Sequence, residues 1–145
     1  MKPNKRAYFL LVVNVLIVSL AVSLAQEPKG RLVIIGGGER TERIMQRFVE
    51  LAGSSEKSRI VIIPMASSIP DTVGMEQVAE LRALGAKNVE CLLFSREQAS
   101  DKVFAERLNG VTGVFFSGGD QARLTAIIVG TPVHQKLKEL FRNGA

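Results

Sequence analysis

Four short runs of almost uninterrupted apolar residues constrain the fold of this chain more than any other feature. The runs lie at residues 31–35, 59–64, 89–94 and 114–116, and each is followed by a segment with helical periodicity. Continuous apolar runs are typical of strands that are buried on both faces, as in parallel sheets covered by helices. Strands that alternate with helices imply right-handed crossover connections. The sequence therefore predicts a single α/β domain in which helices flank a parallel sheet of four strands.

The segments between these runs predict the helices, at residues 41–52, 71–84, 101–108, 121–129 and 133–142. In the first of them, Ile44, Phe48 and Leu51 are spaced so that they share one face, which is predicted to point toward the core. Asp71 is predicted to cap the start of the second helix, and Gly85 is predicted to end it.

The first 25 residues have the pattern of a secretory signal peptide, so the domain is predicted over residues 26–145. Three basic residues near the start precede an apolar run at 10–22, and small residues at 23 and 25 predict cleavage after Ala25. The alternative is an uncleaved membrane anchor, although the apolar run is shorter than the roughly 20 residues that a spanning helix needs. We therefore expect an exported protein, periplasmic or extracellular, which is tethered to the membrane if the segment is not removed.

Charge and cysteine content argue against two kinds of function, namely nucleic-acid binding and catalysis by a cysteine. Three of the 19 basic residues and none of the 14 acidic ones lie in the predicted signal segment, so the remaining domain is nearly neutral. Such a charge balance does not favour nucleic-acid binding. The single cysteine, Cys91, cannot form an internal disulfide, and its place in an apolar run favours a small buried side chain over a catalytic thiolate.

Residues 113–123 combine a strand, a Gly-Gly turn and a helix start within one short stretch. Gly118 and Gly119 follow the apolar run, Asp120 stands at the N-cap position, and Gln121 begins the helix. Ligands of open α/β sheets bind at the carboxyl ends of the strands. A Gly-Gly turn at that edge brings backbone N–H groups close to a ligand, and the helix N-terminus adds positive potential. The alternative is a tight turn that needs glycine only for its backbone angles.

Other catalytic and binding chemistries have weaker support in the sequence. The glycines at 36–38 resemble a dinucleotide fingerprint, but Thr41 stands where that fingerprint requires glycine. His134 lies on a predicted helix beside Lys136 and Lys138 and is predicted to be a solvated surface side chain, and one histidine with one cysteine does not make a zinc site. Ser67 and Ser68 follow a strand but lack the G-x-S-x-G context of a nucleophile. We therefore predict no metal and no cofactor.

Three segments together resemble the cyanophycinase branch of a family of serine peptidases whose other well-known branch is the aspartyl dipeptidases. The segments are residues 30–39, 62–67 and 114–121, and the resemblance extends over residues 30–145. Its most specific part is the Gly-Gly-Asp-Gln sequence after an apolar strand.

The resemblance implies a fold similar to class I glutamine amidotransferases, with a nucleophilic serine at a sharp turn between a strand and a helix. Members of the family hydrolyse small acidic peptide bonds, and cyanophycinases release β-aspartyl-arginine from cyanophycin. Carried over to this chain, the resemblance makes the backbone N–H of Gly119 an oxyanion-hole donor. It also implies that Gly118 permits close approach and that Asp120 and Gln121 line the substrate pocket.

The chain departs from the family pattern because the nucleophile is expected after residue 145. In the family it lies in a segment like GTSAGA, one strand beyond the helix that follows Gly-Gly-Asp-Gln, and residues 142–145 match the approach to that strand. The catalytic histidine and its acidic partner lie later still, so His134 does not match them. We expect the N-terminal half of an exported cyanophycinase-like peptidase, inactive by itself.

Two other classes remain as alternatives. One is a non-catalytic binding remnant of the same fold, and the other is a nucleotide-binding regulator that uses the glycines at 36–38. The expected partner is a peptide or cyanophycin, and the sequence leaves the oligomeric state open.

Overall fold

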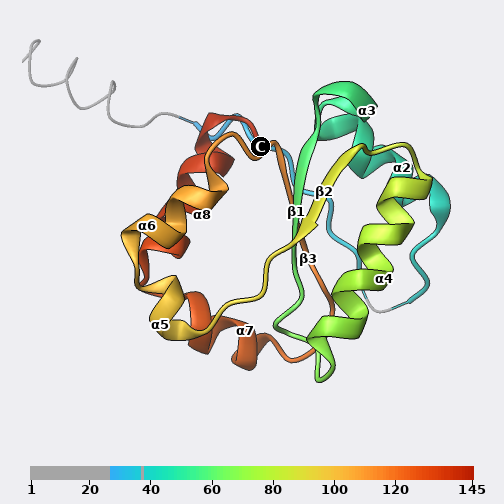
Figure 1. Ribbon diagram of the computed structural model, residues 1–145. Coiled ribbons are helices and arrows are strands. Elements are labelled where there is room, and N and C mark those ends of the chain that lie inside the picture. The colour runs from blue at the N-terminus through green and yellow to red at the C-terminus, as the bar shows by residue number, and fades with distance from the viewer. Residues whose placement is uncertain (1–26, 37) are drawn as a thin grey trace, which may run out of the picture.

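The computed structural model of the chain describes residues 27–36 and 38–145, and in this part a parallel three-stranded sheet lies between two groups of helices (Figure 1). The sheet has the order β2-β1-β3, formed by β1 (Arg59–Ile63), β2 (Asn88–Cys91) and β3 (Gly113–Phe116). Both pairings are parallel. This architecture confirms the predicted α/β class.

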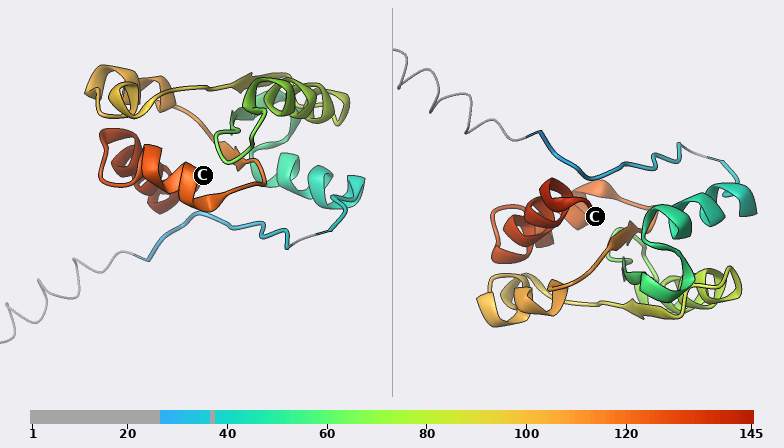
Figure 2. Two further views of the ribbon diagram at one scale, coloured as in Figure 1. Left: turned by 90° about the horizontal axis from the view of Figure 1, so that it is seen from below. Right: turned by 90° about the horizontal axis from the view of Figure 1, so that it is seen from above.

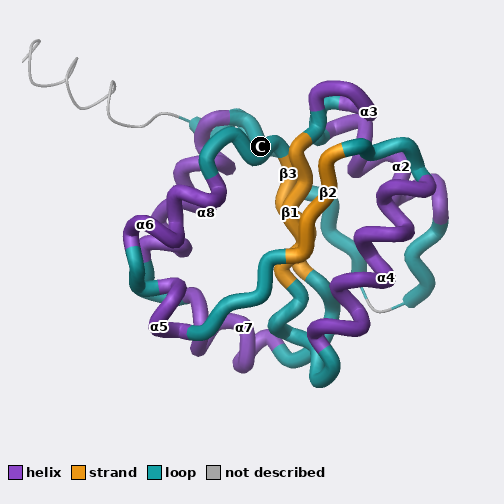
Figure 3. The backbone as a smooth tube through the Cα atoms, in the orientation of Figure 1, coloured by secondary structure: helices purple, strands orange, loops and turns teal. Residues whose placement is uncertain are grey.

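The helices divide between the two faces of the sheet (Figure 3). One group is formed by α2 (Glu42–Leu51), α3 (Ser54–Lys57) and α4 (Pro70–Ala83). The other is formed by α5 (Arg96–Ala99), α6 (Lys102–Ala105), the 3₁₀ turn η1 (Glu106–Leu108), α7 (Gln121–Ile128) and α8 (Pro132–Asn143). Helices on both faces explain why β3 and, after Arg59, β1 contain no polar side chains.

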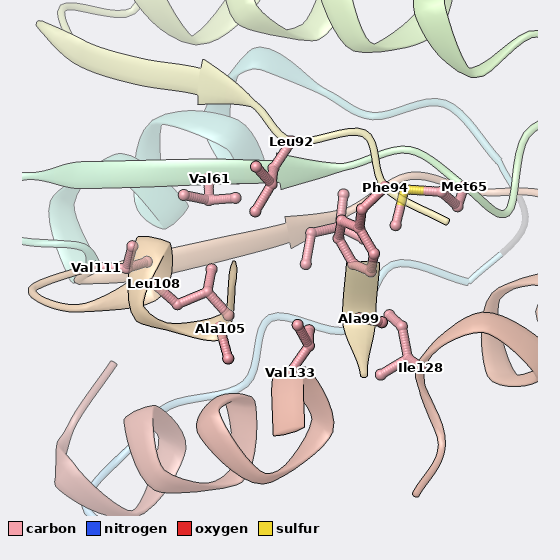
Figure 4. Close-up of a cluster of buried hydrophobic side chains, with 11 residues drawn as sticks. Val61, Met65, Leu92, Phe94, Ala99, Ala105, Leu108, Val111, Ile128 and Val133 are labelled. Carbon is pink, nitrogen blue, oxygen red and sulfur yellow. The ribbon is translucent and has the colours of Figure 1, made fainter. Parts of the chain in front are cut away.

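The central strand β1 supplies side chains to both layers of the core. Val61 and Ile63 belong to the cluster of buried side chains beneath α5 to α8. This cluster, drawn in Figure 4, also contains Leu92 and Val133. Ile60 and Ile62, whose side chains point to the opposite face, belong to the cluster beneath α2 and α4. Successive side chains of a strand point to opposite faces, so this continuous apolar run fills two separate cores.

Beyond β3, on the side away from β1, residues 27–36 form a separate run of chain (Figure 2). A groove of about 990 Å³ lies between this run and β3, and we call it the β3 groove. Its two walls are residues 31–36 and β3, and its sides include residues of α2 and α8.

The predicted strand at residues 31–35 is wrong, because this segment has no regular secondary structure. Leu32 and Ile34 are 70% and 86% exposed. A strand is held by hydrogen bonds to a neighbouring strand, and the β3 groove separates this segment from the edge of β3. The segment is anchored instead by hydrogen bonds from the backbone N–H groups of Lys29 and Gly30 to the carbonyls of Arg142 and Phe141.

Helix α2 forms where it was predicted, but a different set of its residues is fully buried. Met45 and Val49 are 0% and 2% exposed, whereas Ile44, Phe48 and Leu51 are half-buried. Phe48 packs edge-on against the ring of Phe115 in β3, with 5.6 Å between the ring centroids. Phe48 and Leu51 also line the β3 groove, and this accounts for their remaining exposure.

Local capping explains most other differences from the predicted elements. Helix α4 begins at Pro70, which favours the first helical turn, so Asp71 lies inside the helix and Ile69 takes the cap position. Gly85 ends α4 with a φ of 92°, as predicted. The strand predicted at residues 89–94 is β2, which ends at Cys91. Helix α5 was not predicted from the sequence, and a capping box at Ser95 begins it.

The short helix α6 is capped by Asp101, whose carboxylate accepts a hydrogen bond of 2.8 Å from the Val103 N–H. Helix α8 covers the predicted range and extends it by one residue at each end, with the Thr131 hydroxyl at its N-cap. The predicted signal segment, residues 1–25, lies outside the described residues. Among the helices that are described, none has the length and apolar character needed to span a membrane.

Candidate functional site

The turn after β3 forms a compact connection from strand to helix, as the sequence predicted. The Ser117 N–H donates to the Ile63 carbonyl at 3.2 Å and so extends the pairing with β1 by one residue. Gly118 and Gly119 follow, and the Asp120 carboxylate accepts a 2.8 Å hydrogen bond from the Ala122 N–H. This bond caps α7, so the helix N-terminus lies directly after the two glycines.

The loop after β1 packs directly against this turn. The Asp120 N–H donates to the Ala66 carbonyl at 2.8 Å. Gly119 has a φ of 142°, and a Cβ atom added to it would collide with that carbonyl. Only glycine therefore fits at position 119, for both its backbone angle and its contact. The structure thus brings together two of the segments that carry the family resemblance.

Arg123 ties the same two segments together from α7. Its Nη1 atom donates to the Ser67 carbonyl at 2.7 Å. The hydroxyl of Ser67 accepts a hydrogen bond of 3.1 Å from the Ile69 N–H, and Ser67 is only 8% exposed. Ser67 therefore has a local turn-forming role, which is common for serine in loops.

A buried polar pair beneath the turn was missed by the sequence analysis. The Ser117 hydroxyl donates to Oε1 of Gln77 at 2.6 Å, and both residues are almost fully buried. Gln77 lies on the inner side of α4, where Gly74 and Leu81 are also buried. A glutamine on a helix is ordinarily exposed, and nothing in the sequence indicates its partner 40 residues away.

The β3 groove opens beside the turn at the carboxyl end of β3. Gly118, Gly119 and Gln121 line the groove there, together with Gly36 and Arg40. The Arg40 guanidinium lies 5.8 Å from the centroid of the Phe115 ring and 3.3 Å from the Glu80 carboxylate. At this end, the groove thus combines exposed backbone of the turn with the Arg40 guanidinium.

Not all four residues singled out from the sequence have the same position. Gly118, Gly119 and Gln121 border the groove, whereas the Asp120 carboxylate is engaged in the cap of α7 and is not among the described lining residues. Within the described residues, the N–H groups of Gly118 and Gly119 donate to no protein acceptor. Free backbone N–H groups at a helix N-terminus can stabilise negative charge that develops on a bound group.

The other reactive side chains lie elsewhere. Cys91 is half-buried at the end of β2 and packs closely on Gly74 of α4. Burial, and to a lesser extent the nearby Asp71 carboxylate, raises the pKa of its thiol, which opposes the formation of a thiolate. His134 is half-buried rather than fully solvated, and its Nδ1 accepts a hydrogen bond from the Gly130 N–H at 3.3 Å. The part of the chain that the structure describes contains no group of three or more acidic, histidine or cysteine side chains placed to hold a metal.

Comparison with known proteins links this arrangement to one family. The model of peptidase family S51 matches residues 32–145. A cyanophycinase of Trichormus variabilis is 35% identical over 130 residues, which are 87% of this chain and 43% of the relative. Cyanophycinases of Geminocystis herdmanii and Thermosynechococcus vestitus are 32% and 37% identical over 125 and 120 residues.

These matches span 83% and 80% of this chain but only 46% and 37% of the two relatives. The chain therefore spans less than half the length of the curated relatives that it matches. The family match includes β3, the Gly-Gly turn and α7, so the turn beside the groove lies within the region that defines the resemblance. On the extent of the family match and of these identities, the chain belongs to peptidase family S51.

Proposed function

We propose that this chain contributes part of the active site of a cyanophycinase-like serine peptidase that hydrolyses cyanophycin, with release of β-aspartyl-arginine, or related acidic peptides. In this proposal the serine nucleophile, the histidine and its acidic partner belong to the portion of the family fold that the chain does not span. The 145 residues by themselves are expected to be inactive. A non-catalytic binding protein of the same fold is the alternative.

The observation that carries the proposal is the backbone N–H of Gly119 at the border of the β3 groove, which has no acceptor among residues 27–36 and 38–145. When a serine attacks a peptide carbonyl, the carbonyl oxygen becomes an oxyanion, and a fixed N–H donor lowers the energy of that state. One such donor contributes about 3 kcal/mol of transition-state stabilisation. The Ala66 carbonyl holds the turn through Asp120, so the donor is fixed before substrate binds.

The neighbouring residues have separate roles in this proposal. Apart from its chain neighbours, no heavy atom of the described residues lies within 4 Å of where a Cβ on Gly118 would be, so Gly118 leaves room for substrate backbone. Gln121 borders the groove and offers an amide that can hydrogen-bond a peptide. Asp120 acts on the pocket through the cap of α7, which fixes the position of Gln121.

The test uses an extended form, in which this chain is followed by the portion of the Trichormus variabilis cyanophycinase that lies beyond the matched region. The extended form is incubated with cyanophycin, and release of β-aspartyl-arginine is followed by chromatography. We expect release by the extended form and none by the 145-residue chain or by the added portion alone.

Gln121→Ala in the extended form is expected to raise KM or lower kcat/KM by about tenfold, corresponding to one lost hydrogen bond. Gln135→Ala is the matched control, because Gln135 is an exposed glutamine on α8 outside the groove lining. Binding of cyanophycin without any hydrolysis would contradict the peptidase proposal and favour the binding protein.

We further propose that the protein is exported. The proposal rests on the basic residues, the apolar run at 10–22 and the small residues before position 26. Expression with a C-terminal tag, followed by cell fractionation and mass spectrometry, is expected to show an exported product that begins at Gln26. Recovery of the intact chain from the cytosol would contradict export.

A further inference from the structure

The net positive charge of the domain is concentrated at one place on its surface. Residues 27–31 and α8 together contain five basic and two acidic residues, whereas the rest of residues 27–145 contains 11 basic and 12 acidic ones. The domain is nearly neutral as a whole because this place is positive and the remainder is slightly negative. Uneven charge of this kind produces a local field that steers charged partners to one face.

The fold brings the two basic segments side by side, although they are far apart in the sequence. The Lys29 N–H donates to the Arg142 carbonyl at 3.2 Å, and Figure 2 shows residues 27–31 passing beside α8. Lys138 precedes Arg142 by four residues and so lies on the same side of the helix. Four exposed residues together form what we call the α8 basic face: Lys29, Arg31, Lys138 and Arg142.

The cations of the α8 basic face are available to an external anion. Within residues 27–36 and 38–145, none of the four forms an ion pair. Lys136, on another side of α8, is instead paired with Glu139 at 2.9 Å. Glu139 therefore offsets Lys136 and leaves the charge of the α8 basic face in place.

The α8 basic face follows closely on the most apolar segment of the chain. The apolar run at 10–22 ends seven positions before Lys29. An extended chain spans at most about 3.6 Å per residue, so a bilayer that holds the run lies within roughly 25 Å of Lys29. Basic residues beside a membrane segment bind anionic lipid headgroups, and an apolar anchor combined with a basic patch gives stable membrane association.

We propose that the α8 basic face is a docking surface for an anionic lipid bilayer, whose phosphate groups bind its four cations. The apolar run supplies the hydrophobic part of the association, and the α8 basic face supplies the electrostatic part. A bilayer is the occupant, rather than a soluble polyanion, because the apolar run is covalently attached beside the face. The proposal uses neither family membership nor the peptidase reaction.

The test measures binding of the 145-residue chain to sedimenting vesicles. One set of vesicles is phosphatidylcholine alone, and the other is equal parts of phosphatidylcholine and phosphatidylglycerol. The preference for the anionic vesicles, expressed as the ratio of the two dissociation constants, separates the electrostatic part from the contribution of the apolar run. The double variant Lys138→Gln, Arg142→Gln is expected to lower this preference about tenfold, since each cation near the surface strengthens binding several-fold.

The double variant Arg43→Gln, Lys57→Gln is the matched control. Both residues are exposed and lie on α2 and α3, in the other helix layer, and neither forms an ion pair among the described residues. The control removes the same amount of charge and is expected to leave the preference nearly unchanged. An equal loss in the control would show that net charge alone sets the preference, and it would overturn the proposal.

A second pair, Lys29→Gln with Arg31→Gln, keeps the test decisive if the α8 variant does not fold, as judged by circular dichroism. These two residues lie outside the helices and strands, and their loss is expected to lower the preference to a similar extent. High salt should suppress the preference of the wild type as well, because it screens exposed charges. A preference that neither pair lowers would contradict docking through this face. Vesicle binding needs neither export nor hydrolysis, so this result is independent of the proposed function.

Discussion

Gly119 has the tightest constraint of any residue in the candidate site. Its φ of 142° is strained for any residue with a side chain, and an added Cβ would collide with the Ala66 carbonyl. We predict that Gly119→Ala lowers the free energy of unfolding of the 145-residue chain by about 1–3 kcal/mol. The measurement is urea denaturation followed by circular dichroism.

Gly118 offers a matched control beside it. Apart from its chain neighbours, no heavy atom of the described residues lies within 4 Å of an added Cβ, so Gly118→Ala is expected to shift the urea midpoint by much less than Gly119→Ala. Equal shifts for the two variants would show that the packing of the turn on the loop after β1 does not constrain Gly119.

The buried pair of Ser117 and Gln77 gives a second prediction. Ser117→Ala removes the donor of the 2.6 Å hydrogen bond and leaves the Gln77 oxygen buried without it. The expected loss of stability is about 1–3 kcal/mol. Ser100→Ala is the control, because the Ser100 hydroxyl donates to the Arg96 carbonyl at an exposed position. A thermal melt that separates neither variant from the wild type would contradict the assigned role.

The raised pKa of the Cys91 thiol predicts that the free energy of unfolding depends on pH. Burial raises the pKa of its thiol in the folded protein above the value in the unfolded chain, which is about 8.5. The unfolded state then loses its proton first as the pH rises, so the stabilising contribution is complete below that pH and declines above it. Between pH 8 and pH 10, the free energy of unfolding of the wild type should fall more steeply than that of Cys91→Ala. Parallel curves would contradict the raised pKa.

Residues in contact across the sheet edge were the hardest to predict from sequence. The cap at Asp120 follows from local spacing and was predicted. The contacts of Gly119 with Ala66 and of Arg123 with the Ser67 carbonyl join loops that are far apart in the sequence. Such contacts depend on the order of the strands, which local patterns do not specify.

Among the secondary-structure elements, α7 depends most directly on a single side chain. The Asp120 carboxylate satisfies the Ala122 N–H, so Asp120→Ala is expected to cost about 1 kcal/mol of stability. Asp120→Asn keeps an acceptor at the same place and is expected to retain most of that stability. Urea denaturation distinguishes the two, and equal losses would contradict a capping role.

The elements themselves were predicted well where their apolar pattern also had a neighbour in the structure. β1 and β3 and the long helices form at or near the predicted ranges, because each has a core to bury against. Residues 31–35 have the same apolar pattern as β1 but lack a neighbouring strand in the described part of the chain, so they do not form one. The apolar pattern shows that a segment can form a strand, but the strand forms only where a neighbouring strand is present to pair with it.

At the scale of the whole molecule, family membership and the strand-to-helix turn support one account. The model of peptidase family S51 matches residues 32–145. Within these residues, the sheet brings the Gly-Gly turn and the loop after β1 to the same edge, beside the β3 groove. The chain spans less than half of its curated relatives, and in the proposed function the serine, the histidine and its acidic partner belong to the rest of the family fold.

A crystal structure of the extended form after reaction with a peptide aldehyde, which forms a tetrahedral adduct with a catalytic serine, tests whether the Gly-Gly turn is the oxyanion hole. We expect the adduct at the carboxyl end of β3, with its oxygen about 3 Å from the backbone nitrogen of Gly119. An adduct whose oxygen is held by other donors, or that forms away from the Gly-Gly turn, would contradict the assignment of this turn as the oxyanion hole.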